Sequence, residues 1–168
     1  KDLKKKGLKA PHFIECNLLK IKKLENIIKK IIKSKGPIDI LINNAANDDR
    51  HSTKQVDEKY WNNRMDVNLK HFFFTIKAVL RGMIQKKGGA IINLSSVSWM
   101  LGEGDKVAYE TAKSAVIGLT RSFAREFGKY NIRCNSVTPG SIATERQIKH
   151  WLTPCLLYTS DAADDTLW

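Results

Sequence analysis

The sequence lacks the features that mark a membrane protein, a disulfide-rich protein or a metal site. No apolar run approaches the length of a bilayer span, and the first residues, KDLKKKGLKAPHF, contain no hydrophobic signal region. The three cysteines, Cys16, Cys134 and Cys155, form no C-x-x-C pair, and the four histidines are scattered. We therefore expect reduced thiols, no metal centre and a cytoplasmic location.

Arginine is missing from the basic end of the chain. The formal net charge is +12, and residues 1–36 hold twelve lysines and three acidic residues, a net of +9. These lysines fall mainly on the polar face of an expected helix, without aromatic residues between them to stack on bases. A solvated lysine face is therefore favoured, and a non-catalytic basic binding module remains the alternative.

Strand-like and helix-like segments alternate along the chain. Apolar runs typical of strands occur at 11–16, 38–44, 88–96 and 131–140, and helical periodicity occurs at 18–36, 57–87 and 109–128. This alternation predicts an α/β fold with a parallel sheet covered on both faces. Ligands bind such sheets at the carboxyl ends of the strands, which here read NNAA, SS and PG.

The stretch YETAK places Tyr109 and Lys113 four residues apart, on one face of the predicted helix. Taken alone, the pair is typical of a cation–π or snorkelling contact at a helix end. Ser96 lies at the end of a predicted strand, 13 residues before Tyr109, and Asn68 lies within the long helix at 57–87. These four residues form the candidate catalytic set.

The chain resembles the short-chain dehydrogenase/reductase family over about residues 10–154. The resemblance rests on the order and spacing of NNAA at 43–46, VNL at 67–69, Ser96, YETAK at 109–113 and PGSIAT at 139–144. It implies a Rossmann-like doubly wound fold and an oxidoreductase that uses NAD or NADP. It also implies that Tyr109 exchanges a proton with the substrate, assisted by Ser96, Lys113 and Asn68. Lys113 would lower the Tyr109 pKa, Ser96 would bind the reacting oxygen, and Asn68 would hold a relay water.

The same resemblance implies a set of cofactor contacts. These are Asn17, Asn43, Ala45, Ala46, Tyr109, Lys113, Pro139, Gly140, Ile142 and Thr144. Asn17 stands where the family usually has Asp, and Ala46 where it usually has Gly.

Three stretches, NNAANDDRH, SSVSWMLG and TERQIKHWLTP, resemble the sugar 1-dehydrogenase branch, which acts on D-xylose, D-galactose or L-arabinose. The implied reaction oxidises an aldose at C1 to a lactone. The implied substrate contacts are Ser98, Trp99, Asn47, Asp48 and Gln147, with Trp99 as an apolar platform for the sugar ring. Alternatively, Trp99 packs its loop, NDDRH is a salt-bridged turn, and the substrate is another alcohol, ketone or oxoacyl compound.

The family's glycine-rich phosphate turn, T-G-x-x-x-G-x-G, is not in the sequence. We therefore expect residues 1–154 to be a partial Rossmann domain that lacks the first two strands and the last one. The segment at 11–16 would be the third strand. Residues 155–168 resemble translated sequencing adapter rather than a dehydrogenase, although a genuine divergent tail remains the alternative. We expect the 168-residue chain to be inactive and the complete parent to form homo-oligomers.

Overall fold

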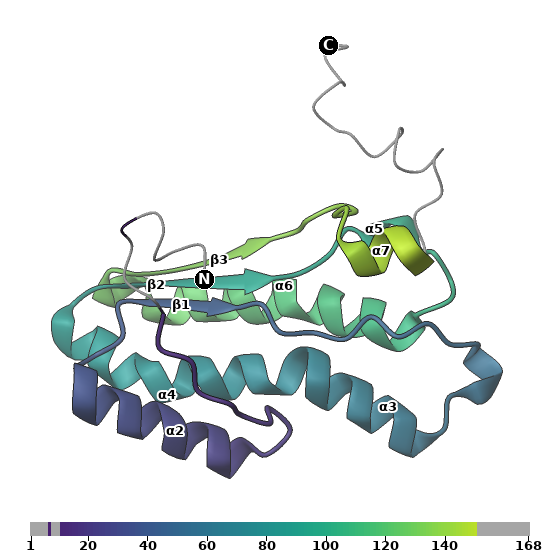
Figure 1. The fold of residues 1–168 in the computed structure, drawn as a ribbon. Coiled ribbons are helices and arrows are strands. Elements are labelled where there is room, and N and C mark those ends of the chain that lie inside the picture. The colour runs from purple at the N-terminus through teal and green to yellow at the C-terminus, as the bar shows by residue number, and fades with distance from the viewer. Residues whose placement is uncertain (1–6, 8–10, 151–168) are drawn as a thin grey trace.

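The computed structural model describes residue 7 and residues 11–150 (Figure 1). The predicted tail at 155–168 lies outside these residues. In chain order the elements are α2 (Ile21–Lys35), β1 (Ile40–Asn43), the 3₁₀ turn η1 (Thr53–Gln55), α3 (Glu58–Met65), the π-helical turn η2 (Asp66–Lys70), α4 (His71–Lys86), β2 (Gly89–Leu94), α5 (Ser98–Leu101), α6 (Val107–Phe127), the 3₁₀ turn η3 (Gly128–Tyr130), β3 (Ile132–Val137) and α7 (Glu145–His150).

The three strands form one parallel sheet in the order β1-β2-β3. Leu41 pairs with Ile91, which pairs with Cys134, and two residues further along Asn43 pairs with Asn93. All three strands end at the same edge of the sheet, because parallel strands run in one direction. The predicted α/β class with a parallel sheet is therefore confirmed.

The two faces of the sheet differ in what covers them. The helices α4 and α6 pack against one face, and α2 packs on α4 on that same side (Figure 1). On the other face Ile40, Ile42 and Val137 keep 61%, 59% and 47% of their surface exposed. Among the described residues, the expected second layer of helices is absent from this side of the sheet, the open face.

The segment at 11–16 is not a strand, contrary to the prediction. Phe13 is 85% exposed, and Cys16 at the end of the segment packs against the core. A strand is stable only when a neighbour pairs with its backbone groups. No described strand pairs with this segment, so its apolar composition alone does not make it a strand.

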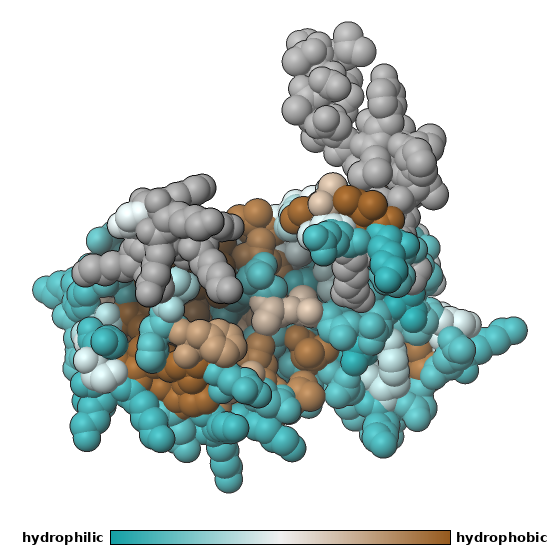
Figure 2. Space-filling model, viewed as in Figure 1, coloured by the Kyte–Doolittle hydropathy of each residue, from teal (hydrophilic) through white to brown (hydrophobic). Residues whose placement is uncertain are grey.

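The apolar stripe of α2 is buried against α4, as its periodicity predicts. Leu24 and Ile28 are buried, and Ile32 rather than the expected Ile31 completes the contact. Gly36 ends the helix with φ +88°, and its N–H donates to the Ile32 carbonyl (2.9 Å). The lysines of α2 face solvent, along the hydrophilic lower rim of Figure 2.

The predicted helix at 57–87 consists of α3 and α4 joined by η2 without a break. Asn68 lies at the centre of this π-helical turn and is fully buried. A π-helical turn adds one residue to the helix, which rotates the side chains that follow it and often marks a functional position. The turn places Asn68 on the side that faces the sheet edge.

The helix α6 ends at Phe127, beside the predicted stop at Gly128, and the 3₁₀ turn η3 follows it directly. Gly128 keeps a right-handed helical conformation and continues into η3, and Asn131 ends the segment with φ +59°. Asparagine tolerates this left-handed conformation better than most residues, so Asn131 suits the end of the η3 turn that follows the helix.

Candidate active site

The strands β1 and β2 are joined near their carboxyl ends by a buried chain of polar side chains. Asn43 Nδ2 donates to Asn93 Oδ1 (2.9 Å), and the two residues are paired in register. Thr75 of α4 donates to Asn43 Oδ1 (2.7 Å), and Asn93 Nδ2 donates to Thr120 of α6 (3.0 Å). Each member is at most 7% exposed. The chain fixes both helices to the strand ends, because each buried polar group depends on the next.

Tyr109 lies in the first turn of α6 and faces Ser96, which follows β2. Ser96 Oγ accepts hydrogen bonds from the N–H (3.2 Å) and the hydroxyl (3.0 Å) of Ser98, which is buried. The hydroxyl proton of Ser96 is therefore not used by Ser98, and in this structure it faces Tyr109. The arrangement suits a serine that donates to a reacting oxygen beside a phenol that exchanges a proton with it.

Lys113 is held against the end of β2 at two points. Its Nζ donates to the Leu94 carbonyl (2.6 Å), and its own carbonyl accepts from the Ser95 hydroxyl (2.8 Å). The side chain is 1% exposed, and Nζ lies 5.3 Å from the centre of the Phe72 ring. Burial lowers the pKa of Lys113 to about 8.

The surroundings of Tyr109 raise its pKa, contrary to the expectation that Lys113 lowers it. Burial is the largest cause, and the carboxylates of Asp48 and Glu103 add to it, while the hydrogen bond with Ser96 acts in the opposite direction. Lys113 Nζ is 5.6 Å from the centre of the Tyr109 ring. The residues of this chain alone therefore keep the Tyr109 phenol protonated.

Asn68 and His71 bring unpaired polar atoms into the interior. Asn68 Oδ1 accepts from the Asn47 N–H (2.7 Å), but its Nδ2 has no hydrogen-bond partner among the described residues. The ring nitrogens of His71, which is 2% exposed, make no hydrogen bond of normal geometry, although the backbone of Asp66 and of Ala45 lies close enough to raise its pKa. Burial lowers the pKa of His71 to about 4, so the imidazole is neutral at pH 7. Buried groups of this kind are usually satisfied by water or a bound molecule.

A cavity of about 560 Å³ lies at the carboxyl ends of the strands. Its walls come from the segments after all three strands, from the start of α6 and from α7. Of the predicted site residues it brings together Ala46, Asp48, Ser96, Ser98, Tyr109, Pro139, Gly140, Ile142, Thr144 and Gln147. Lys113 and Asn68 are buried next to this region without lining it.

Besides Asn68 and Lys113, five more predicted residues are not part of the cavity wall: Asn17, Asn43, Ala45, Asn47 and Trp99. Asn17 is exposed and its Oδ1 accepts from the Leu19 N–H (3.0 Å), a local turn before α2. Asn47 Oδ1 likewise accepts from the Asp49 N–H (2.9 Å).

The structure places Trp99 outside the cavity wall, half-buried and with its indole nitrogen enclosed, which favours the alternative in which the ring packs its loop. A platform for the sugar ring stays a prediction. Leu101 and Ile142 supply apolar lining, and they are 69% and 59% exposed.

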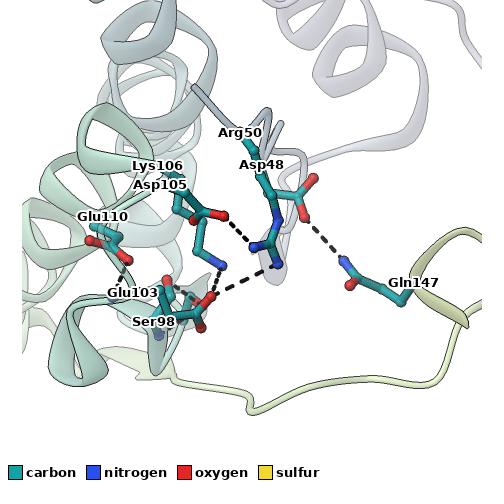
Figure 3. A network of polar contacts seen from close by, with 9 residues as sticks. Asp48, Arg50, Ser98, Glu103, Asp105, Lys106, Glu110 and Gln147 are labelled. Atoms are coloured by element: carbon teal, nitrogen blue, oxygen red, sulfur yellow. Dashed lines mark hydrogen bonds and ion pairs between the residues drawn. The ribbon is translucent and has the colours of Figure 1, made fainter. Parts of the chain in front are cut away.

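Sequence reasoning missed a set of charged residues at the cavity wall. Arg50 points between Asp105 and Glu103 and pairs with both, and Lys106 Nζ lies 2.7 Å from Glu103 (Figure 3). Gln147 reaches Asp48 from α7 (3.0 Å). The opposite charges of NDDRH and GEGDK in the sequence indicate ion pairs between the two stretches, in agreement with the alternative of a salt-bridged turn.

Neither a membrane segment nor a metal cluster was found in the described part of the chain. No described helix is both long and apolar enough to cross a bilayer. Likewise, no three His, Cys, Asp or Glu residues at 7 and 11–150 are arranged to hold a metal ion.

The sequence matches a family model described as short chain dehydrogenase over residues 1–153. It is 44% identical over 144 residues to the D-xylose 1-dehydrogenase of Caulobacter vibrioides, covering 86% of this chain and 56% of the relative. It is 42% identical, with the same coverage, to the "Probable galactose dehydrogenase GalD" of Rhizobium meliloti. This chain thus spans about half the length of these curated relatives.

A similar fold occurs in a solved structure described as ElxO with NADP bound. The TM-score is 0.77 at 32% sequence identity, and the match covers 82% of this chain and 56% of that one. Helices and strands of this arrangement therefore occur in a protein that holds NADP.

Proposed function

Because this chain belongs to the short-chain dehydrogenase family, we propose that it is part of a longer NAD(P)-dependent dehydrogenase that oxidises an aldose at C1 to a lactone. One observation carries the chemistry. Tyr109 and Ser96 face the same cavity, while Lys113 is anchored one helical turn behind Tyr109. The relatives named for D-xylose and galactose support the choice of an aldose.

The described residues fit one end of a dinucleotide. Ala46, Pro139, Gly140, Ile142 and Thr144 give a cavity wall of small and apolar groups, suited to a nicotinamide and its ribose. The sequence has no glycine-rich turn for the pyrophosphate, so the chain as given holds the adenosine end poorly. When bound, NAD(P) supplies the acceptor for the hydride that leaves C1.

In this proposal Ser96 donates its hydroxyl proton to the C1 oxygen of the sugar, because Ser98 already occupies the acceptor side of Ser96. Tyr109 takes the proton from the same oxygen. For that it must be deprotonated, which a nearby positive charge favours. Lys113 keeps its charge at neutral pH, and Asn68 Nδ2 has a free donor for a water next to it.

We also propose that α4 and α6 pack against the same helices of a second copy in a homo-oligomer. Phe73 is 42% exposed and contacts Phe74 edge to face and Phe123 at a tilt, and Phe123 stacks on Phe127 to continue the aromatic strip. Sedimentation of the full-length protein tests this, and a monomer would contradict it.

The activity test uses the full-length protein with NAD⁺ and NADP⁺ against D-xylose, D-galactose, L-arabinose, a polyol and an oxoacyl thioester, followed by the absorbance of the nicotinamide. We expect turnover of an aldose. Turnover of only the polyol or the thioester would keep the dehydrogenase and overturn the sugar.

The role of Tyr109 is tested with a matched pair of tyrosines. Tyr109→Phe should lower kcat by at least about 100-fold, the usual contribution of a positioned acid or base, without weakening cofactor binding. Tyr130→Phe, at the opposite end of α6 beside Phe127, should leave kcat unchanged. Full turnover by Tyr109→Phe would overturn the assignment.

A further inference from the structure

Residues 47–51, the segment NDDRH after β1, contact five different parts of the molecule. The Asn47 N–H donates to Asn68 Oδ1 (2.7 Å), and Asp48 Oδ2 accepts from Gln147 Nε2 (3.0 Å). Asp49 Oδ2 accepts from Arg64 Nη1 (2.7 Å), and Arg50 pairs with Asp105 and Glu103. His51 contacts Tyr60 and Ala108. The segment therefore joins η2, α7, α3, the residues before α6 and α6 itself.

His51 is the most enclosed member of this segment, at 9% exposed. Its backbone N–H donates to the Asp105 carbonyl (2.6 Å), and its ring contacts Tyr60 edge to face, with centroids 4.9 Å apart. Nδ1 lies 2.9 Å from the Tyr60 hydroxyl and 3.1 Å from the Asp49 carbonyl. On the other side of the ring, the Ala108 N–H donates to Nε2 (3.4 Å).

The helix that receives this contact has no side-chain cap of its own. The N-cap residue of α6 is Lys106, whose side chain makes no capping hydrogen bond. The first N–H groups of a helix have no partner within the helix, so an acceptor from elsewhere has to satisfy them. His51 supplies one to Ala108, the residue directly before Tyr109.

The direction of this hydrogen bond fixes the form of the imidazole. A backbone N–H can only donate, so Nε2 of His51 must be the unprotonated acceptor. The proton of the neutral ring then lies on Nδ1, where the Asp49 carbonyl accepts it. An imidazole with a proton on Nε2 would set two donors against each other at Ala108.

The surrounding ion pairs hold the same region more weakly. Arg50, Glu103 and Asp105 each leave about a third of the side chain exposed. Exposed pairs of this kind contribute little, since solvent screens them. The enclosed imidazole is therefore the contact of this segment that most directly fixes the start of α6.

We propose that His51 is a positioning residue for Tyr109, acting as an imidazole cap that holds the first turn of α6 through the Ala108 N–H. The contact links the segment after β1 to the helix that carries Tyr109 and Lys113. This role of His51 does not depend on whether the substrate is a sugar. Only the kinetic part of the test rests on the proposed dehydrogenase function.

The test compares two substitutions in the full-length protein. His51→Leu removes the acceptor, whereas His51→Gln places a side-chain oxygen near the site of Nε2. We expect amide hydrogen exchange at Ala108 to become at least about tenfold faster in His51→Leu and to return toward the wild-type rate in His51→Gln. His12→Leu, at an exposed position before α2, is the control and should change nothing.

Two further readouts separate positioning from general stability. Nitrogen NMR of the wild-type protein at neutral pH should show His51 with its proton on Nδ1. For an aldose substrate, kcat should fall by about 10- to 100-fold in His51→Leu with KM for the cofactor nearly unchanged, as expected for a misplaced catalytic group. The glutamine variant should recover most of kcat.

A proton on Nε2 of His51 would overturn the proposal even if the leucine variant failed to fold. Unchanged exchange at Ala108 in a folded His51→Leu protein would overturn it as well. The exchange and NMR results do not depend on turnover, so failure of the proposed sugar oxidation would leave them interpretable.

Discussion

The covered face and the open face of the sheet are built from alternate residues of the same three strands. On the covered face Leu41, Ile91 and Cys134 lie in one row under α4 and α6, and Ile91 and Cys134 are at most 5% exposed. On the open face Ile40 and Ile42 are more than half exposed. Apolar side chains accordingly reach the surface close to the strands in Figure 2.

The contrast shows that the apolar composition of a strand does not determine whether both of its faces are covered. The run IDILINN is apolar on both faces, which is typical of a strand covered on both sides. Among the described residues, helices pack against one side only, so Ile40 and Ile42 on the other side stay more than half exposed. The buried polar chain of Asn43, Asn93, Thr75 and Thr120 lies on the covered side, where it joins the strands to α4 and α6.

The largest expected effect comes from two adjacent phenylalanines of α4 in different environments. Phe72 is fully buried on the covered side, whereas Phe73 is 42% exposed. Phe72→Ala should lower the free energy of unfolding by about 3–5 kcal/mol, because it removes a buried ring and leaves a cavity. Phe73→Ala should cost much less. Urea unfolding of the full-length protein measures both, and equal losses would contradict the contrast.

Acid should weaken the covered side through His71. Burial lowers its pKa from 6.5 to about 4 in the folded protein, so between these values the unfolded chain binds the proton and the folded chain does not. Stability should therefore be complete above pH 6.5 and fall as the pH drops toward 4, by on the order of 3 kcal/mol. His71→Leu should flatten this part of the urea-unfolding pH profile, and His12→Leu should not. An unchanged profile in His71→Leu would remove His71 as the cause.

The polar chain at the strand ends should contribute an intermediate effect. Asn93→Ala leaves Asn43 and Thr120 without their buried partner, so we expect a loss of roughly 1–3 kcal/mol in unfolding free energy. Asn135→Ala, an exposed position on β3, should change it by less than about 0.5 kcal/mol. If the two variants had equal free energies of unfolding, the polar chain would not contribute to stability.

The smallest effect on stability is expected on the open face. In the 168-residue chain Ile42→Lys should change unfolding by less than about 0.5 kcal/mol while reducing aggregation and the binding of an apolar dye. The same chain should show no saturable NADH fluorescence change. A large destabilisation by Ile42→Lys in the full-length protein, but not in the 168-residue chain, would show that further residues of that protein cover this face.

Much of the site could be predicted from the sequence because it depends on local order. Tyr109 and Lys113 lie one turn apart on any helix through that stretch, and a parallel sheet brings the ends of its strands to one edge. Ser96, Ala46 and Gly140 therefore lie at one cavity, as expected from their places after apolar runs. What Tyr109 does in catalysis remains a prediction.

The α/β class and the alternation of helices with the strands at 40–43, 89–94 and 132–137 follow from the sequence, because the period of apolar residues depends only on local geometry. Whether an apolar face has a neighbour follows from the tertiary structure. The segment at 11–16 pairs with no described strand and stays irregular, and Trp99 lies outside the cavity wall with its indole nitrogen enclosed. Likewise, the contact between His51 and Ala108 joins residues 57 positions apart. Periodicity shows which residues share a face, but the burial of that face and the partners of its polar groups depend on chain segments far away in sequence.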